Sequence, residues 1–373
     1  VLNNSELLFE DGGVFVINKG SGTGNVNVMS FINSEINSNN TNIQFNVSGD
    51  MNAIEMANSE LNLFSTTLDY NTTTGTPSSF IYGDSTSELN LYYSQVEQER
   101  SFTFIRSKGK VVMNTSNISM ENSSSNAIIL DFGSHFEINN VNISHNTSLN
   151  NTVGYGGGIS LYTRAFTLDN TIINYNTSNR SGGGVFVDLL LGFAPDTIIA
   201  NFNNVNISHN SASDIDGYGG GMFFNNFSNF GDQINFKNVI ISNNSATYAG
   251  GLNFYCGNYN YNNDVSFHPI SNLTISGNTA IYGGGLRFSH CENLNGLFDF
   301  KLANLTISGN TADYGGGIYL NDSYLNLTNS ILWDNSEGSQ EIFFSTSDPS
   351  GIEISYSDIE GGEGAIVSND FGS

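Results

Sequence analysis

The chain has 373 residues and a formal net charge of −25, with 35 acidic residues against 10 lysines and arginines. Nucleic acids and anionic membrane surfaces are bound mainly through clustered Lys and Arg, so both are poor partners for this chain. No stretch approaches the roughly 18 apolar residues of a membrane-spanning helix, and we expect no membrane insertion. The 38% hydrophobic content, with 27 Phe and 17 Tyr, argues against disorder because it is enough to build a core.

Residues 1–125 carry short alternating strands without a strict repeat, and we expect irregular coils there. Leu7 to Val16 alternates in this way, and Thr66 to Asn71 is a weak copy of a segment that recurs later in the chain. Further short apolar strands are expected at Ile54, Phe80, Phe102, Ile128 and Ile342.

Residues 126–365 repeat a strand of alternating apolar and polar residues that ends in Asn. Val141 to Asn146 (VNISHN) is one copy and Leu273 to Asn278 (LTISGN) is another. A strand this short is not stable alone, but equivalent strands of successive coils would pair in parallel about 4.8 Å apart. The inward Ile or Leu three residues before each Asn would then stack into a core. These markers are Leu68, Val96, Ile118, Ile143, Ile173, Ile207, Ile241, Ile275, Ile307, Leu332 and Ile359.

A glycine triplet followed by a short apolar strand repeats out of phase with the first element, as at Gly156–Gly158 and Gly315–Gly317. Such glycines fit a corner where the backbone needs positive φ or another segment comes close. The recurrence, with no GxxxxGK[ST] motif, favours architecture over a phosphate-binding loop. The residue before most triplets predicts a tyrosine stack of Tyr155, Tyr218, Tyr248, Tyr282 and Tyr314.

The Asn that ends each repeated strand is expected at the bend itself, because Asn tolerates left-handed backbone angles. Stacked Asn side chains can also hydrogen-bond from coil to coil as a ladder. The two markers predict an all-β fold, a right-handed parallel β-helix of about 12–13 coils with glycine-rich corners, as one domain over residues 1–373. The expected ladder is Asn146, Asn176, Asn210, Asn244, Asn278, Asn310 and Asn335.

The segments Leu305–Asn310 and Gly315–Leu320 resemble secreted right-handed parallel β-helix repeat proteins, and they are similar to the GGAI and FxxN repeats of chlamydial polymorphic outer-membrane proteins. The resemblance covers roughly residues 125–365. It implies a solenoid at the cell surface, in a group that includes adhesins, passenger domains and carbohydrate-active enzymes.

We expect no enzyme activity and no catalytic residues. The Asn-Thr-Asp, Asp-Asp, Gly-His-Gly and Arg-Ile-Lys signatures of polygalacturonase-type enzymes are missing, and none of the five arginines lies beside a carboxylate cluster in the sequence. A polysaccharide lyase or hydrolase remains the third alternative. A polyanionic substrate would be repelled by the −25 charge.

No cofactor is expected, and two weaker metal readings stay open. His145 and His209 occupy equivalent turn positions two coils apart, so they are either a metal pair or solvent-facing turn residues. Asp214–Gly217 and Asp358–Glu363 are candidate Ca²⁺ contacts, although surface loops explain them as well.

Stacking brings Cys256 and Cys291 onto adjacent coils within disulfide reach, which favours an oxidising compartment. Asn-x-Ser/Thr sequons add a second extracellular signal. The sequons expected on outward positions are Asn71, Asn114, Asn117, Asn142, Asn206, Asn272, Asn304, Asn321 and Asn326.

The leading functional hypothesis is an extracellular or cell-surface structural β-solenoid, a rod or filament subunit that self-associates end to end and carries N-glycans. The motivation is the uninterrupted coil pattern without a sequence signal for a capping element, since solenoids need polar caps. The alternative is a surface adhesin or carbohydrate-binding passenger, with glycans as partners.

Overall fold

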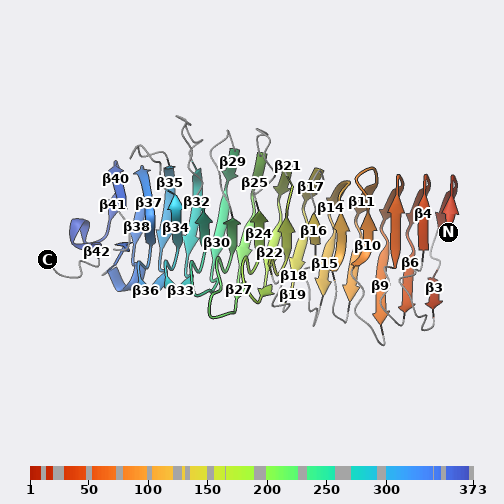
Figure 1. Cartoon of the computed structure of the whole chain (residues 1–373), viewed down its shortest axis with the longest axis horizontal. Helices are drawn as coiled ribbons and strands as arrows, with labels where there is room; N and C mark the ends of the chain where they lie inside the picture. The colour runs from red at the N-terminus through yellow and green to blue at the C-terminus, as the bar shows by residue number, and fades with distance from the viewer. Residues whose placement is uncertain are drawn as a thin grey trace.

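The computed structural model describes residues 1–9, 14–19, 29–47, 53–72, 79–98, 103–120, 128–130, 135–148, 155–163, 165–188, 199–225, 233–256, 270–291, 300–338, 340–345 and 350–368. They form an elongated parallel β-helix whose coils stack along the long axis of the molecule, with the termini at opposite ends (Figure 1). The predicted fold class is confirmed. Each coil passes through three strands, which belong to three parallel sheets that we call A, B and C.

Sheet A holds the strands that follow the glycine triplets and their N-terminal equivalents. Its strands are β1 (Leu2–Asn3), β4 (Met29–Ile32), β7 (Ile54–Ala57), β10 (Ser79–Gly83), β13 (Thr103–Ser107), β16 (Ile128–Leu130), β20 (Ile159–Leu161), β24 (Val185–Asp188), β28 (Met222–Asn225), β31 (Leu252–Tyr255), β34 (Leu286–Cys291), the start of β37 (Ile318–Thr328), β39 (Ile342–Phe344) and β42 (Ile366–Ser368).

Sheet B follows sheet A in every coil. Its strands are β2 (Glu6–Phe9), β5 (Glu35–Asn39), β8 (Glu60–Phe64), β11 (Glu88–Tyr92), β14 (Lys110–Asn114), β17 (His135–Asn139), β21 (Ala165–Asp169), β25 (Ile199–Asn203) and β29 (Gln233–Lys237), continued by the first residues of β32 (Ile270–Ser276) and β35 (Phe300–Ser308), the end of β37, and β40 (Gly351–Ser355).

Sheet C contains the repeated strand that carries the apolar marker. Its strands are β3 (Val14–Lys19), β6 (Asn42–Val47), β9 (Thr67–Thr72), β12 (Gln95–Gln98), β15 (Asn117–Met120), β18 (Asn142–Ser144), β22 (Ile172–Asn174), β26 (Asn206–Ser208), β30 (Val239–Ser242), the ends of β32 and β35, β38 (Ile331–Trp333) and β41 (Asp358–Ile359).

Short elements fill the corner between sheet C and the next coil's sheet A. These are β19 (Thr147–Ser148), β23 (Thr177–Ser178), β27 (Ser211–Ala212), β33 (Thr279–Tyr282), β36 (Thr311–Tyr314) and the 3₁₀ turns η1 (Asn335–Gly338) and η2 (Gly362–Ala365).

The predicted apolar markers stack in register along sheet C from β9 to β41, from Leu68 opposite Val96 to Leu332 opposite Ile359. Val96 and Ile118, which lack the terminal Asn, are buried in that stack. In sheet A, Ile54 and Ile128 stand in register as expected, but Ile81 and Ile105 fill the column between them. The strand expected at Phe80 is present as β10, where Phe80 is fully buried, and Phe102 lies outside the described residues.

The triplet corner shows why glycines are needed. The first glycine has positive φ, as at Gly219 with 62°, although Ala249 adopts 57° at the same place in the next coil. At the second glycine the limit is space, because a Cβ on Gly220 would lie 2.4 Å from the carbonyl oxygen of Ser245. Backbones of neighbouring coils thus approach too closely there for any side chain.

Candidate functional site

The predicted Asn residues form a buried ladder along seven successive coils between sheet C and sheet A. The Oδ1 of Asn244 accepts hydrogen bonds from the backbone N–H and the Nδ2 of Asn210, at 2.8 and 3.0 Å. Its Nδ2 donates to the Ile207 carbonyl at 3.0 Å and to the Oδ1 of Asn278 at 3.0 Å. The same pattern joins Asn146, Asn176, Asn210, Asn244, Asn278, Asn310 and Asn335.

The ladder residue is not the one with left-handed backbone, so that part of the expectation was wrong. The positive φ falls on the residue before it, as at His145 (60°), Tyr175 (54°) and Asn243 (54°). That preceding side chain points to solvent. The Asn after the bend is buried because its side chain must reach the next coil.

A buried carboxylate ends the ladder. Glu341 accepts from the backbone N–H of Asn335 at 3.0 Å with one oxygen and from its Nδ2 at 2.5 Å with the other. The Glu341 side chain takes the place that the next Asn would occupy. Burial raises the pKa of Glu341 above its ordinary value, and the two hydrogen bonds only partly oppose that rise.

The tyrosine stack forms from Tyr218 through Tyr248 and Tyr282 to Tyr314, with ring centroids 4.7, 5.1 and 5.3 Å apart. Ser181 stands between Tyr155 and Tyr218 in this column and interrupts the stack. The ring of Tyr155 stacks on Phe186 instead. The stack covers the outward side chains of sheet A and so makes a second, smaller aromatic core.

Arg287 lies inside this outer core. Its guanidinium carbon is 5.0 Å from the Tyr248 ring centroid and 5.7 Å from that of Tyr218, and it donates to the Oδ1 of Asn253 at 3.1 Å. Burial lowers the pKa of Arg287, and burial likewise raises the pKa of Tyr248 and Tyr319. The aromatic faces stabilise the cation where the described residues give it no carboxylate partner.

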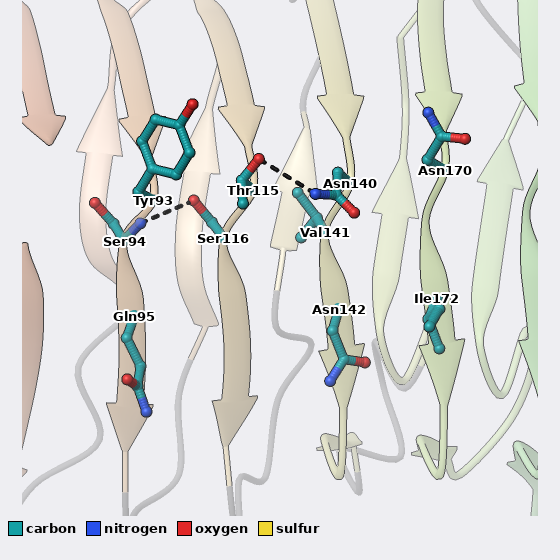
Figure 2. Close-up of a pocket in the computed structure, with 10 residues that line it drawn as sticks. All are labelled: Tyr93, Ser94, Gln95, Thr115, Ser116, Asn140, Val141, Asn142, Asn170 and Ile172. Atoms are coloured by element: carbon teal, nitrogen blue, oxygen red, sulfur yellow. Dashed lines mark hydrogen bonds between the residues drawn. The ribbon is translucent and has the colours of Figure 1, made fainter. Parts of the chain in front are cut away.

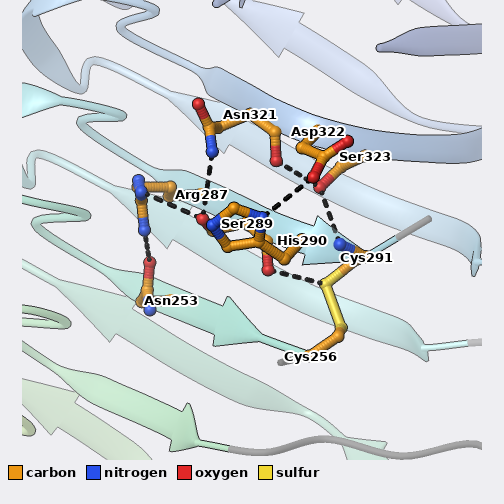
Figure 3. The surroundings of a disulfide bond; sticks show 9 residues. All are labelled: Asn253, Cys256, Arg287, Ser289, His290, Cys291, Asn321, Asp322 and Ser323. Atoms are coloured by element: carbon orange, nitrogen blue, oxygen red, sulfur yellow. Dashed lines mark hydrogen bonds and ion pairs between the residues drawn. A yellow bond between two sulfur atoms is a disulfide. The ribbon is translucent and has the colours of Figure 1, made fainter. Parts of the chain in front are cut away.

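Cys256 and Cys291 are joined by a disulfide across neighbouring strands of sheet A (Figure 3), with Cα atoms 5.0 Å apart. Beside it, the Nδ1 of His290 pairs with the Oδ2 of Asp322 at 2.9 Å, between bends of successive coils. These contacts tie three adjacent coils together on one side of the rod.

The structure does not bring the side chains of either predicted metal site together among the described residues. The ring of Tyr175 stacks between His145 and His209, with centroid distances of 5.2 and 4.8 Å, so the two imidazoles do not meet. Among the described residues no group of three or more His, Cys, Asp or Glu side chains gathers at either acidic segment or elsewhere.

The predicted sequons occupy two kinds of outward position. Asn272 and Asn304 are exposed at left-handed bends. Half-buried positions on the strands hold Asn114, Asn142, Asn206, Asn321 and Asn326. The side chains of Asn71 and Asn117 lie outside the described residues. Two ladder residues, Asn146 and Asn176, also stand in sequons but are fully buried, which removes them as acceptors in the folded chain.

Sequence reasoning missed a groove along the corner between sheets B and C (Figure 2). In the described coils one residue there has positive φ, and in most of them the next is buried and the third points outward. The first and third side chains therefore form two rims, and the second forms the floor. The groove has a volume of about 370 Å³. Its rims are Tyr93, Thr115, Asn140 and Asn170 on one side and Gln95, Asn142 and Ile172 on the other, over Ser94, Ser116 and Val141.

A second groove of about 660 Å³ repeats this arrangement nearer the C-terminal end of the same corner. Its rims are Asn304, Asn329 and Tyr356 against Thr306, Ile331 and Asp358. Tyr93 is 65% exposed and Tyr356 is 91% exposed, so each groove has one open phenol ring at its end.

The rim is itself a ladder, and its signal was present in the sequence as a second Asn column, three residues before seven of the eleven apolar markers. Along the rim, Asn204 Nδ2 donates to Asn170 Oδ1 at 3.1 Å and Asn238 Nδ2 donates to Asn204 Oδ1 at 3.0 Å. Near the second groove, Asn329 Nδ2 donates to Asn304 Oδ1 at 2.6 Å. These exposed amides are held in fixed orientations.

Comparison with models of known protein families gives no match for this sequence, and a search of curated proteins gives none either. Within the part of the chain that the structure describes, no helix has the length and apolar character to cross a membrane.

Proposed function

We propose that the chain is an extracellular structural rod, a surface rod or filament subunit that assembles end to end and carries N-glycans. The observation that supports it most is the continuity of its stacks, because apolar markers, corner side chains and backbone hydrogen bonds run parallel to one axis through almost every coil. At about 4.8 Å per coil, thirteen strands of sheet C amount to a rod of roughly 60 Å.

The disulfide supports an extracellular location, since such bonds persist mainly in oxidising compartments. End-to-end assembly is supported by the strands at the two ends of the described solenoid. Among the described residues β2 and β3 pair only with β5 and β6, and β42 pairs only with β39. Unpaired parallel edges with complementary N–H and C=O groups are templates for a second copy, and such a contact is head to tail and open.

Electron microscopy of the purified chain over a range of concentrations tests this proposal. We expect rods of about 60 Å that lengthen into filaments as concentration rises. The variant Leu8→Lys places a charge on the first coil, where Leu8 is 54% exposed, and should shorten the filaments. Ile240→Lys is the matched control, because Ile240 is 44% exposed in the middle of the rod. Isolated rods at every concentration would rule out assembly, and compact particles would rule out the rod.

A further inference from the structure

We propose that the corner between sheets B and C binds an extended, uncharged glycan chain along the rod axis. The two grooves described above are the site, with Tyr93 and Tyr356 as its aromatic contacts. This inference adds a binding activity to the proposed rod, and its failure would leave the structural function untouched.

The shape of the first groove favours a linear ligand. Four successive coils contribute to it, so three steps of about 4.8 Å separate Tyr93 from Asn170. Each coil offers the same elements, a rim side chain, a small floor side chain and an outer side chain. A repeating lining along one direction fits a polymer whose units repeat in that direction better than a compact metabolite.

The lining chemistry fits sugar hydroxyls. A primary amide has two N–H donors and an oxygen with two lone pairs, so a rim Asn that gives one N–H to its neighbour keeps further hydrogen-bonding capacity. Asn140 donates to the Oγ1 of Thr115 at 3.3 Å, and Asn170 donates to the Oδ1 of Asn139 at 3.2 Å, which orients both amides. Pre-oriented donors and acceptors lose less entropy when a ligand binds.

The exposed tyrosines supply the apolar part of recognition. A phenol ring presents a flat apolar face with a polar tip, and a pyranose ring presents a face of C–H groups that can lie on it. Tyr93 and Tyr356 take left-handed backbone angles at the bend, with φ of 53° and 51°, where Asn is the commonest residue in other coils. Large aromatic residues at these two bends place an apolar surface beside the amides.

The charge of the groove lining favours a neutral ligand over an acidic one. Every side chain that lines the first groove is uncharged, and the second groove contains one carboxylate, Asp358. The chain as a whole carries −25. A polymer of uronic acids or phosphates would meet repulsion without a Lys or Arg in either lining.

An added peptide strand fits the corner less well. Strand addition needs open backbone groups at a sheet edge. Here the backbone N–H of Tyr93 donates to Asn114 and that of Asn140 donates to Asp169, so the rim backbone is paired from coil to coil.

The test is binding of the full chain to an array of linear neutral and acidic glycans, followed by calorimetry with hexamers and dimers of the best neutral ligand. Asn142 and Asn304 line the grooves and are also predicted sequons, so the protein should be produced in bacteria to leave them unmodified. We expect a neutral hexamer to bind at least ten-fold more tightly than its dimer, and galacturonate hexamers not to bind.

The variants Tyr93→Asn and Tyr356→Asn keep a residue that the bend accepts, and the double variant should lower hexamer affinity at least ten-fold. Tyr175→Asn is the control, because Tyr175 is an exposed tyrosine at a left-handed bend of a different corner. Trp333, the only tryptophan, lies two residues beyond Ile331, so its fluorescence should respond to hexamer and lose that response in Tyr356→Asn alone. The proposal fails if no neutral glycan binds, if acidic glycans bind more tightly, or if the double variant binds as well as the unmodified sequence.

Discussion

The N-terminal coils and the coils after residue 140 carry their side-chain ladders at different corners of the solenoid. In most of the described bends a residue with positive φ is followed by a buried residue whose backbone N–H needs an acceptor. In the early coils that acceptor, at the corners between sheets A and B and between sheets B and C, is a hydroxyl of the next coil. Ser34 N–H donates to Ser59 Oγ at 3.1 Å, and Ser94 N–H donates to Ser116 Oγ at 3.3 Å. In the later coils the acceptor at the corner between sheets C and A is an Asn amide oxygen, while hydroxyl acceptors persist at the other two corners, as for the Leu305 N–H on Ser330 Oγ at 3.1 Å.

The two solutions differ in how many bonds they make between coils. A corner Ser accepts one N–H from the preceding coil and gives its own proton mainly to the carbonyl two residues back, as Ser59 does to Ala57. A ladder Asn accepts two bonds from one neighbouring coil and donates two more to its neighbours. Since a solenoid's stability is a sum of coil terms and nearest-neighbour terms, the Asn coils should be the more strongly coupled part of the rod.

The largest expected effect comes from Asn244→Ala, in the middle of the ladder. It leaves the buried N–H and Nδ2 groups of Asn210 without their acceptor, and we expect a loss of about 4 kcal/mol. Ser94→Ala in the N-terminal coils removes one acceptor and should cost about 1 kcal/mol. Urea unfolding, combined with hydrogen exchange of the strands on either side, measures both losses.

Asn243→Gly controls for the loss of an amide at this turn. It removes an exposed side chain at a left-handed bend, where Gly277 and Gly309 stand in later coils. Its cost should stay below about 1 kcal/mol. Equal losses in Asn244→Ala and Ser94→Ala would show that the two corner chemistries couple coils equally.

The same comparison shows what could be predicted from the sequence. The Asn ladder was predictable because Asn, Ile and the glycine triplets recur together, and stacking then placed Cys256 opposite Cys291. The serine ladder was not, because Ser is common throughout the chain and its bonding partner lies one coil away at a variable spacing. The left-handed angle was assigned one residue too late, since the sequence does not tell which of two adjacent bend residues turns inward. The groove could not be predicted from the sequence, because it requires the positions of both rims in space. The Asn column before the markers indicated only one of these rims.

A smaller effect should follow removal of the disulfide by Cys256→Ser with Cys291→Ser. Its closed loop spans 35 residues, for which chain-entropy arguments give about 3.8 kcal/mol. The measurement sharpens the comparison, because the bond lies in the Asn-ladder coils and contributes to their stability independently of the amides. Hydrogen exchange should rise in β31 and β34 and stay unchanged in β4 to β14. If removing the bond abolished the whole difference between the two regions, the ladder would not be its cause.

The smallest effect concerns the end of the ladder, at Glu341. Burial raises the pKa of this carboxyl in the folded chain above its unfolded value, so the folded state binds its proton more tightly. The stability due to this group is therefore fully present below the unfolded pKa and is lost as pH rises through the folded pKa. Acidification also relieves the repulsion of a −25 chain, and Glu341→Gln isolates the local part, because Gln keeps an acceptor for Asn335 without titrating. Unfolding midpoints between pH 4 and 8 should fall less steeply in Glu341→Gln than in the unmodified chain. Parallel pH profiles would mean that this carboxyl has the same pKa in the folded and unfolded chain, with its two hydrogen bonds balancing burial.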